Sequence, residues 1–499
     1  MLVMKSFFNL SSARVWFLIG STLLVVLLLI HTRGLIPYDE GWFLQVGRRM
    51  YQGELIYKDF SFLYTPGGVY VNYLAYKLFG VSVLASRLMA LFNSFVAISS
   101  LLVIARFLKL KLWLAVSLPL LYIFWGPAHI NFIWPVMLCL TTAVVSGAIW
   151  LTQSRSKAIW WWVFLTGVLS AMTLIFKQNF GLAIGLTNTF FLFLPTPYRK
   201  FKYWLAHLFG YLSLLFLQLA YWVHTKTLSW FLDDMQDILV NKIVKRGIFS
   251  SPLPWQYPGP WFYQLVKFSF YLLPLIISLL TIGWLWKRKK LTWMFLPAIS
   301  FTYYLLSIRP TTDYVHLAPL LTLSSVSLIL LIHILNKSIF RKIVVSLMVA
   351  LLLLGGYSAI FLNYYRWETP LKLQSNWIAH PQVLISTDAK QEQIITDLTN
   401  YFKIEAKSEN HLFIYNFSPI YYLILDKKNP TRYEYLHSGV VDDRMEQEVV
   451  MSLQKHRVKY IMSDVPVKER QNKIAQYILA NYRPVYFTHK YTVWQLQEN

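Results

Sequence analysis

Cysteine is almost absent from this sequence: the 499 residues contain one, Cys139, which lies within an apolar stretch. A single cysteine excludes a disulfide scaffold and any thiolate cage around a metal ion. Charged residues are also scarce, at 14% of the chain against 56% hydrophobic residues. A soluble protein of this length needs more charged side chains to cover that much apolar surface. The sequence therefore predicts a membrane protein with several spans.

Acidic residues are the scarcer charged type, with 23 Asp and Glu against 47 Lys and Arg and a formal net charge of +24. A nucleic-acid-binding protein gathers its basic residues on a polar face. Here they form short clusters between apolar stretches, which argues against that class. Eight acidic residues lie in residues 1–362 and the other fifteen in residues 363–499. This shift predicts a multi-span domain over 1–362, with a first external loop at 31–85, and a small extracytoplasmic α/β domain over 363–499.

Apolar segments predict about eleven transmembrane helices. They cover residues 15–31, 86–105, 112–125, 132–152, 158–176, 181–195, 203–223, 263–285, 291–308, 317–335 and 343–362. Eleven crossings leave seventeen cations and no carboxylate on one side of the membrane, and the positive-inside preference makes that side cytoplasmic. We therefore expect a multi-pass plasma-membrane protein with a cytoplasmic N-terminus and an extracytoplasmic C-terminal domain. The first span is expected to be an anchor, because no small-residue cleavage site follows it.

The loop and the tail carry their own secondary-structure signals. Two helix-like stretches in the first loop, 40–52 and 66–79, are each followed by a glycine, Gly53 and Gly80. In the tail, strands are expected at 411–415, 459–462, 485–488 and 492–496, and helices at 445–456 and 467–481. The predicted fold class is a mainly α polytopic membrane protein with a C-terminal extracytoplasmic α/β domain.

Several common catalytic motifs are missing from the sequence. It has no Gly-rich phosphate loop, no His-Glu-x-x-His motif, no nucleophile elbow and no internal repeat. Function must therefore be sought in shorter motifs and in the side of the membrane on which they fall.

A series of short motifs resembles the GT-C glycosyltransferases, in the branch that includes protein O-mannosyltransferase-like and aminoarabinose-transferase-like enzymes. The resemblance covers the whole chain in outline, and the order of the motifs carries it. They are Asp39-Glu40-Gly41-Trp42, Gly53 to Asp59, Thr65-Pro66-Gly67, Lys77 to Gly80, Lys177-Gln178-Asn179, Tyr421-Tyr422-Leu423 and Pro430 to Tyr433.

The resemblance implies a GT-C-like fold and an integral-membrane glycosyltransferase, either a hexosyl- or a pentosyltransferase. Such an enzyme moves a sugar from a polyprenyl-phosphate donor to an extracytoplasmic acceptor, which could be a protein, a lipid or a surface glycan. The family typically inverts the anomeric centre in a single displacement. An acidic residue of the first loop acts as base in the family, and Asp39 matches its position, with Glu40 as its neighbour.

The chemistry of that transfer asks for the same types of group. An acceptor hydroxyl needs a carboxylate to take its proton, and a departing phosphate needs fixed cations. The expected substrate-binding residues are Asp59, Arg87, Lys177, Arg309, Asp313 and His316. One phosphate in the leaving group does not require a divalent ion, so we expect no cofactor and no essential metal, although a divalent metal would be compatible with the reaction.

Each candidate also has a simpler interpretation. Asp39 could cap the helix that follows it, and Asp59 could close a turn. Lys177 and Arg309 could extend toward the membrane surface from the ends of spans, and Asp313 could pair with His316 in a loop. For Asp233, Asp234 and Asp237, a solvated helix face is favoured.

Two other functional classes remain as alternatives to the enzyme. A transporter or lipid-linked-sugar flippase would also be large, basic and polytopic. Transporters tend to show repeats and ionisable residues near the middle of the bilayer, and neither is found in this sequence. A non-catalytic assembly protein is a third possibility, against which the charged groups of the first loop argue weakly.

Overall fold

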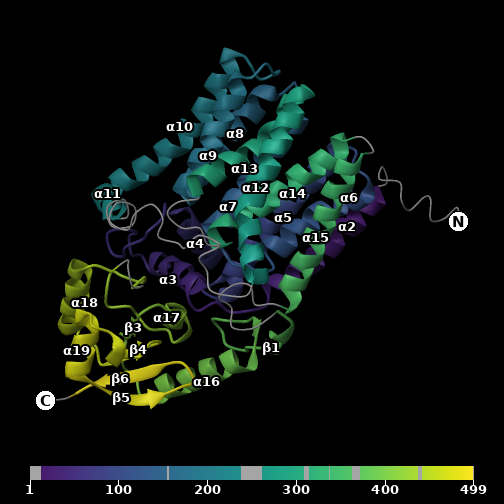
Figure 1. Ribbon diagram of the computed structural model, residues 1–499. Coiled ribbons are helices and arrows are strands. Elements are labelled where there is room, and N and C mark those ends of the chain that lie inside the picture. Colours follow the sequence, from purple (N-terminus) through teal and green to yellow (C-terminus); the bar gives the residue numbers. More distant parts are fainter. Residues whose placement is uncertain are drawn as a thin grey trace. The chain divides into compact units, whose positions relative to one another are not determined.

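A computed structural model describes residues 13–153, 157–237, 261–307, 314–335, 338–361, 371–436 and 441–497 (Figure 1). The chain divides into two compact units. The first comprises residues 1–31, 90–222 and 243–371, and the second comprises 32–89, 223–242 and 372–499.

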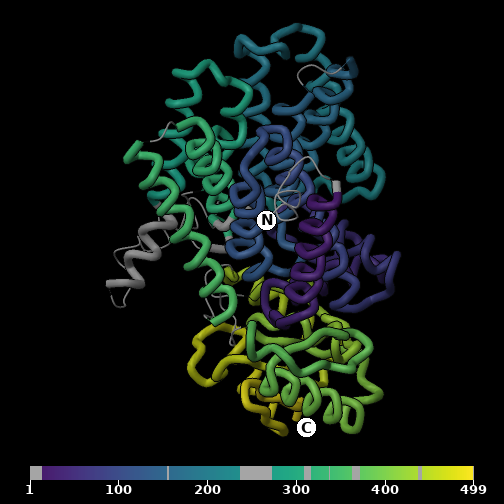
Figure 2. Tube along the Cα trace, turned by 90° about the vertical axis from the view of Figure 1, so that its right-hand side faces the viewer, coloured from purple at the N-terminus to yellow at the C-terminus, as the bar shows by residue number. Residues whose placement is uncertain are grey.

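The first unit is a bundle of helices (Figure 1 and Figure 2). Its helices are α2 (Ala13–His31), α5 (Val83–Phe107, from residue 90 onward), α6 (Leu112–Trp125), α7 (Pro135–Thr152), α8 (Ile159–Phe176), α9 (Gln178–Phe193), α10 (Phe201–His224), α12 (Trp261–Lys287), α13 (Phe295–Ser307), α14 (Tyr314–Ile334) and α15 (Ile339–Phe361). Among the described residues, each of the eleven predicted apolar segments thus corresponds to a helix. Within the described residues, α2, α5, α7, α8, α10 and α15 are long and apolar enough to cross a membrane.

Helix α7 is the most enclosed of these six helices, with 89% of its apolar window buried against 22–39% for the others. A helix that is apolar on all sides belongs in the interior of a bundle, whereas exposed apolar faces suit contact with lipid. Polar side chains connect α7 to its neighbours: Trp150 Nε1 donates to Asn188 Oδ1 at 2.7 Å, and the Thr142 and Thr173 hydroxyls lie 2.7 Å apart. Such bonds stabilise helix pairs where water is absent.

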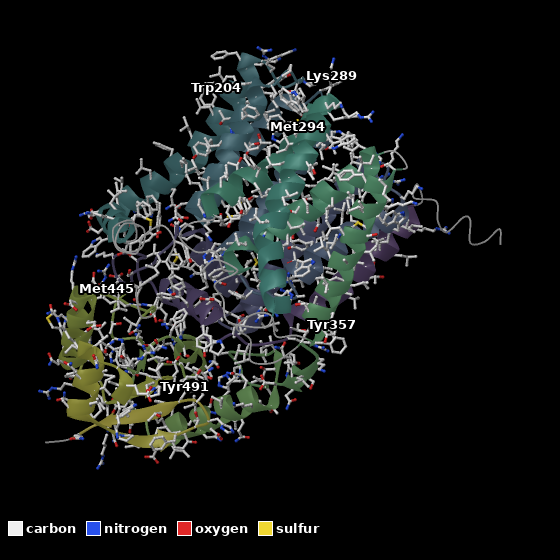
Figure 3. The ribbon with its side chains drawn as sticks, in the orientation of Figure 1. Trp204, Lys289, Met294, Tyr357, Met445 and Tyr491 are labelled. Atoms are coloured by element: carbon white, nitrogen blue, oxygen red, sulfur yellow. The ribbon has the colours of Figure 1, made fainter. Side chains whose placement is uncertain are left out.

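The predicted cytoplasmic cations include two clusters, at 199–202 and 287–290. Lys289, after α12, and Trp204, near the start of α10, lie at one end of the unit, and Tyr357 of α15 lies toward the other (Figure 3). This agrees with a common side for the clusters at 199–202 and 287–290. Which side of the membrane each end faces remains a prediction.

Helices α8 and α10 cross at a pair of glycines. A Cβ on Gly167 would lie 2.0 Å from the carbonyl oxygen of His207, and one on Gly210 would lie 2.1 Å from that of Phe164. The two backbones therefore touch where neither residue has a side chain, which is a common means of close packing between membrane helices.

Replacing Gly167 with Ala should separate α8 from α10 and lower the unfolding temperature of the purified protein, at a cost of about 2 kcal/mol from overpacking. Gly185→Ala in α9 is the matched control, because its Cβ would meet no heavy atom within 4 Å. Equal unfolding temperatures for the two variants, measured by tryptophan fluorescence in the same detergent, would contradict the close crossing.

The second unit combines the first external loop with the tail. The loop contributes α3 (Asp39–Tyr51) and α4 (Gly67–Phe79), and α11 (Leu228–Asp237) joins them. Gly53 and Gly80 follow the loop helices with φ of 96° and 82°, so the two predicted stops are confirmed. Loop residues Leu44, Tyr76 and Val83 share a hydrophobic core with the tail. The sequence predicts that residue 362 separates the membrane-spanning domain from the extracytoplasmic domain, and this boundary remains a prediction.

The tail is built on a four-stranded sheet of order β3-β4-β6-β5. The strands are β3 (Phe413–Tyr415), β4 (Tyr460–Ser463), β5 (Tyr482–Phe487) and β6 (Thr492–Leu496), with β3 parallel to β4 and the other neighbours antiparallel. A separate pair joins β1 (Asn376–Trp377) to β2 (Ser386–Thr387). The α/β tail that the sequence predicted is confirmed.

Helices cover both faces of this sheet. Alternate residues of β4 face opposite sides, so Tyr460 and Met462 pack with α16 (Ala389–Ile404) and α17 (Ile420–Ile424), while Ile461 packs with α18 (Asp443–Lys455) and α19 (Lys473–Asn481). The helix expected over 467–481 was too long. Residues 467–469 form a 3-10 turn, and α19 starts only after Asn472, whose side chain accepts from the Ala475 N–H.

Candidate active site

Helix α3 carries the Asp39-Glu40-Gly41-Trp42 motif. Asp39 is its first residue and is partly exposed, while Tyr38 occupies the N-cap position. The simpler interpretation of Asp39 as the N-cap residue therefore does not match the structure. The aligned peptide dipoles at a helix N-terminus favour a negative charge, so this position suits an ionised carboxylate.

Glu40 is held by a buried ion pair. The Arg87 guanidinium donates to both carboxylate oxygens of Glu40, with Nη2 2.7 Å from Oε2, and the N–H of Ile36 donates to Oε2 at 3.1 Å. Both side chains are almost fully buried. Arg87 also donates to the carbonyl oxygen of Gly34. The pair joins the first turn of α3 to the start of α5, and this position suits a role in holding Asp39 in place.

The other end of α3 is fixed to the tail by two consecutive arginines. Arg48 donates to the carbonyl oxygens of Tyr422 and Lys427 at 2.9 and 2.8 Å, and it pairs with Asp426. Arg49 donates to Glu434 at 2.9 Å and to Glu54 at 2.7 Å. It also donates to two backbone carbonyl oxygens, those of Thr431 and Asp59. Neither arginine is among the site residues that the sequence predicts.

The Arg49–Glu434 pair is the buried centre of these contacts. The side chain of Glu434 has no exposed surface, and that of Arg49 is 7% exposed. Burial raises the pKa of Glu434, and the neighbouring Arg49 guanidinium opposes that rise. Glu434 directly follows the Pro430–Tyr433 motif, so the pair joins this part of the tail to the first loop.

Packing against α17 and against aromatic rings also fixes the first turn of α3. A Cβ on Gly41 would lie 2.6 Å from the backbone nitrogen of Ile420, so α3 and α17 touch at this glycine. One turn of helix spans Tyr38 to Trp42. The Tyr38 ring stacks on Phe417 with centroids 6.2 Å apart, and Trp42 packs against Tyr435 at 5.0 Å. Phe417 and Tyr435 themselves meet edge to face at 4.4 Å.

Asp59 closes a tight turn, as its simpler interpretation has it. Its carboxylate accepts from the Leu55 N–H at 2.7 Å, and its own N–H donates to the Leu55 carbonyl oxygen at 2.8 Å. Tyr57, inside this turn, has a left-handed φ of 70°. Whether Asp59 also contacts substrate remains a prediction.

Asp234 was expected on a solvated helix face, and this was wrong. It is 8% exposed and accepts from the Phe62 N–H at 3.0 Å, with Arg432 3.8 Å away. The amphipathic pattern of α11 gave no sign that the loop would cover this face. Beside Arg432 lies a pocket of about 300 Å³, whose lining includes Arg49, Asp59 and Glu448.

Lys177 and His316 belong to the first unit. Lys177 is 5% exposed and lies between α8 and α9. One turn later, Phe180 stacks on Tyr303 at 4.0 Å, and the Tyr303 hydroxyl donates to the His316 carbonyl oxygen at 2.7 Å. Asn179 of the same motif donates to Ser307, at the end of α13. The Lys177-Gln178-Asn179 motif thus lies near the facing ends of α13 and α14.

Two other predicted residues, Arg309 and Asp313, lie outside the described residues. Of the six that are described, Asp39, Glu40, Asp59 and Arg87 belong to the second unit, and Glu40 and Arg87 are in direct contact. The expectation from the sequence that Asp39, Asp59, Lys177, Arg309 and His316 converge on one outward-facing cavity remains a prediction. Among the described residues, no group of three or more His, Cys, Asp or Glu side chains is arranged to hold a metal ion.

These elements define a multi-pass membrane protein with a GT-C-like fold, in which a helical first loop and an α/β tail accompany a bundle of apolar helices. Solved structures with this fold include ArnT from Cupriavidus metallidurans. Its complex with undecaprenyl phosphate is 13% identical, with 97% of this chain and 98% of that chain covered and a TM-score of 0.57. Its apo structure is 12% identical over the same shares, with a TM-score of 0.60. The predicted resemblance is therefore confirmed at the level of the fold.

The oligosaccharyltransferase from Archaeoglobus fulgidus is a more distant match. Its apo structure is 11% identical, covers 89% of this chain and 69% of its own, and has a TM-score of 0.49, which is too low to support an argument. No protein-family model and no curated protein matches the sequence.

Replacing Glu434 with Ala should loosen the first loop from the tail, because Arg49 would remain buried without its innermost partner. Removing one member of a buried pair typically costs about 3 kcal/mol or more. We expect a lower unfolding temperature and faster proteolysis of the tail. Glu469→Ala, at an exposed position in the same domain, is the control. Indistinguishable behaviour of the two variants would show that the pair contributes nothing to docking.

Proposed function

We propose that this protein is an integral-membrane glycosyltransferase that moves a sugar from a polyprenyl-phosphate donor to an extracytoplasmic acceptor. The observation that carries the proposal is the position of Asp39, at the start of a helix that is held at both ends, in a chain with the fold of ArnT. The bound undecaprenyl phosphate of the ArnT structure supports a donor of this chemical class.

Asp39 acts as the general base in this proposal. Its carboxylate takes the proton of the acceptor hydroxyl while the hydroxyl oxygen attacks the anomeric carbon. The bond from that carbon to the phosphate oxygen breaks, and its electron pair leaves with the lipid phosphate. A single displacement of this kind inverts the anomeric centre. General-base catalysis of such a step typically contributes about 10²–10⁴ in rate.

Glu40 and Arg87 act as positioning residues in the same proposal. Their charges neutralise each other in a buried pair, so neither is readily available for proton transfer or for binding a phosphate. Holding a base within a fraction of an ångström of its productive place is itself worth a large share of the rate.

The departing phosphate needs a fixed positive charge. Lys177 is the described cation that we assign to it, because it lies in a motif of the resembled family and is buried at a helix junction. Arg309 is assigned the same task from the sequence. Neither assignment calls for a metal ion, and a divalent metal would add to their charge without replacing it.

The replacement Asp39→Asn should abolish transfer, because an amide cannot accept the proton of the acceptor. Membranes or nanodiscs containing the variant are supplied with several polyprenyl-phosphate sugars, and the glycosylated products are detected by mass spectrometry. We expect a loss of at least about 100-fold with unchanged expression and membrane insertion.

Asp397→Asn is the matched control for this substitution, since Asp397 lies on α16 and its carboxylate accepts from the neighbouring Gln393 side chain. Full activity of Asp39→Asn would rule out Asp39 as the base. Movement of the intact lipid-linked sugar across the membrane, without transfer, would favour the flippase alternative.

A second prediction separates the donor site from the base. Lys177→Gln should raise the KM for the polyprenyl-phosphate sugar by about tenfold, as expected from the loss of a charge-assisted contact to phosphate. The acceptor KM should be unchanged. Lys200→Gln, within a predicted cytoplasmic cluster, is the control, and an equal donor KM for the two variants would contradict the role of Lys177.

A further inference from the structure

The tail contains a pocket of about 560 Å³ that the proposed reaction does not use. Its volume lies within the range of small-ligand sites, about 300–1,000 Å³. It lies where the parallel strand β3 ends, beside the first turns of α18 and α19 on the same face of the sheet. Met445, labelled in Figure 3, marks that first turn of α18. In open α/β sheets, ligands commonly bind outside the carboxyl ends of the strands.

Local contacts hold the wall of the pocket in place. Asn416 follows β3 with a left-handed φ of 86°, and its side-chain amide donates to Asp464, directly after β4, at 3.0 Å. The Tyr415 hydroxyl donates to Asn472 Oδ1 at 2.9 Å. Glu446 accepts from the Lys473 N–H at 2.9 Å and is 9% exposed. The ends of a strand and of two helices are therefore joined around the cavity.

The lining combines amides, charges of both signs and apolar surface. Amides are contributed by Asn416, Gln471, Asn472 and Gln476; charges by Asp443, Glu446, Arg470 and Lys473; apolar surface by Leu436, Val441 and Ile474. The two carboxylates balance the two cations, so a phosphate would meet repulsion as well as attraction. Each hydroxyl of a neutral sugar both donates and accepts hydrogen bonds, and amides beside carboxylates and cations satisfy both functions.

The wall of this pocket is continuous with the aromatic packing around Asp39. Asn416 and Leu436 line the pocket, and their chain neighbours Phe417 and Tyr435 form the edge-to-face pair described above. Those two rings pack against Tyr38 and Trp42, which lie on either side of Asp39 in the sequence. The chain segments that line the pocket thus also contact the first turn of the helix that carries the proposed base.

We infer that this pocket binds a neutral oligosaccharide segment of the acceptor, away from the hydroxyl that reacts. The inference that the ligand is a saccharide rests on the pocket alone, and the inference that it is part of the acceptor rests on the proposed function. The acceptor class that follows is a glycan rather than a bare protein or lipid.

Binding is tested with the full chain in lipid nanodiscs and no donor present. Chitotetraose and maltotetraose serve as neutral probes. Their binding is measured by saturation-transfer difference NMR, with inorganic phosphate added as competitor. We expect at least one of the two saccharides to bind without displacement by phosphate. Binding of neither saccharide, or displacement by equimolar phosphate, would overturn the saccharide site.

Two substitutions locate the binding in this pocket. Arg470→Gln and Asp443→Asn each remove one charged partner and should weaken saccharide binding by about tenfold. Lys468→Gln and Glu469→Gln are the controls, because both side chains are exposed on the neighbouring 3-10 turn and do not line the pocket. Unfolding temperatures identify any variant that is merely misfolded. Equal affinities for all four variants, in folded protein, would place the binding elsewhere.

The acceptor role has its own readout. Arg470→Gln should raise the KM for a glycan acceptor while leaving kcat and the donor KM unchanged. An unchanged acceptor KM would refute this role even if the saccharide binds. Failure of the proposed function would appear separately, as transfer that survives Asp39→Asn, and would leave the donor-free binding result intact.

Discussion

The buried contact between Arg49 and Glu434 is the interaction on which the organisation of the second unit depends. An isolated buried charge is very costly, and the Arg49 guanidinium compensates that of the Glu434 carboxylate, whose side chain has no exposed surface. The partner comes from the first loop, nearly four hundred residues earlier in the chain. The loop helix and the tail are therefore each incomplete without the other, and they fold as one unit although the spans of the bundle separate them in sequence.

This arrangement explains why an acid near the first span can have a defined position. Loops are usually mobile and exposed, yet α3 is buried along most of its length. Its first turn is fixed by the Glu40–Arg87 pair and by Gly41 against Ile420, and its last turn is fixed by Arg48 and Arg49. Asp39 is the carboxylate of this helix that remains partly exposed, which supports the role of base proposed for it.

The sequence predicted those features that depend on local patterns. Apolar runs located the eleven α-helices that the structure describes in the first unit, and glycines marked the ends of both loop helices, because solvation and backbone freedom act over short distances. Local patterns could not reveal that Asp234 is covered by the loop or that Arg48 and Arg49 bind the tail, since these contacts join remote segments. The end of α19 was predicted and its start was not, because the cap at Asn472 competes with an uninterrupted apolar pattern.

The enclosure of α7 has a consequence for how the protein is made. Its neighbours include α8, α9, α13 and α14; Trp150 of α7, for example, bonds to Asn188 of α9 and packs on Phe295 of α13. A ribosome synthesises α13 long after α7, with α10 and α12 in between. During that interval, part of the surface of α7 must be covered by lipid or by a membrane chaperone. Biogenesis of this bundle therefore includes a stage at which α7 is already inserted in the membrane and α13 has not yet packed against it.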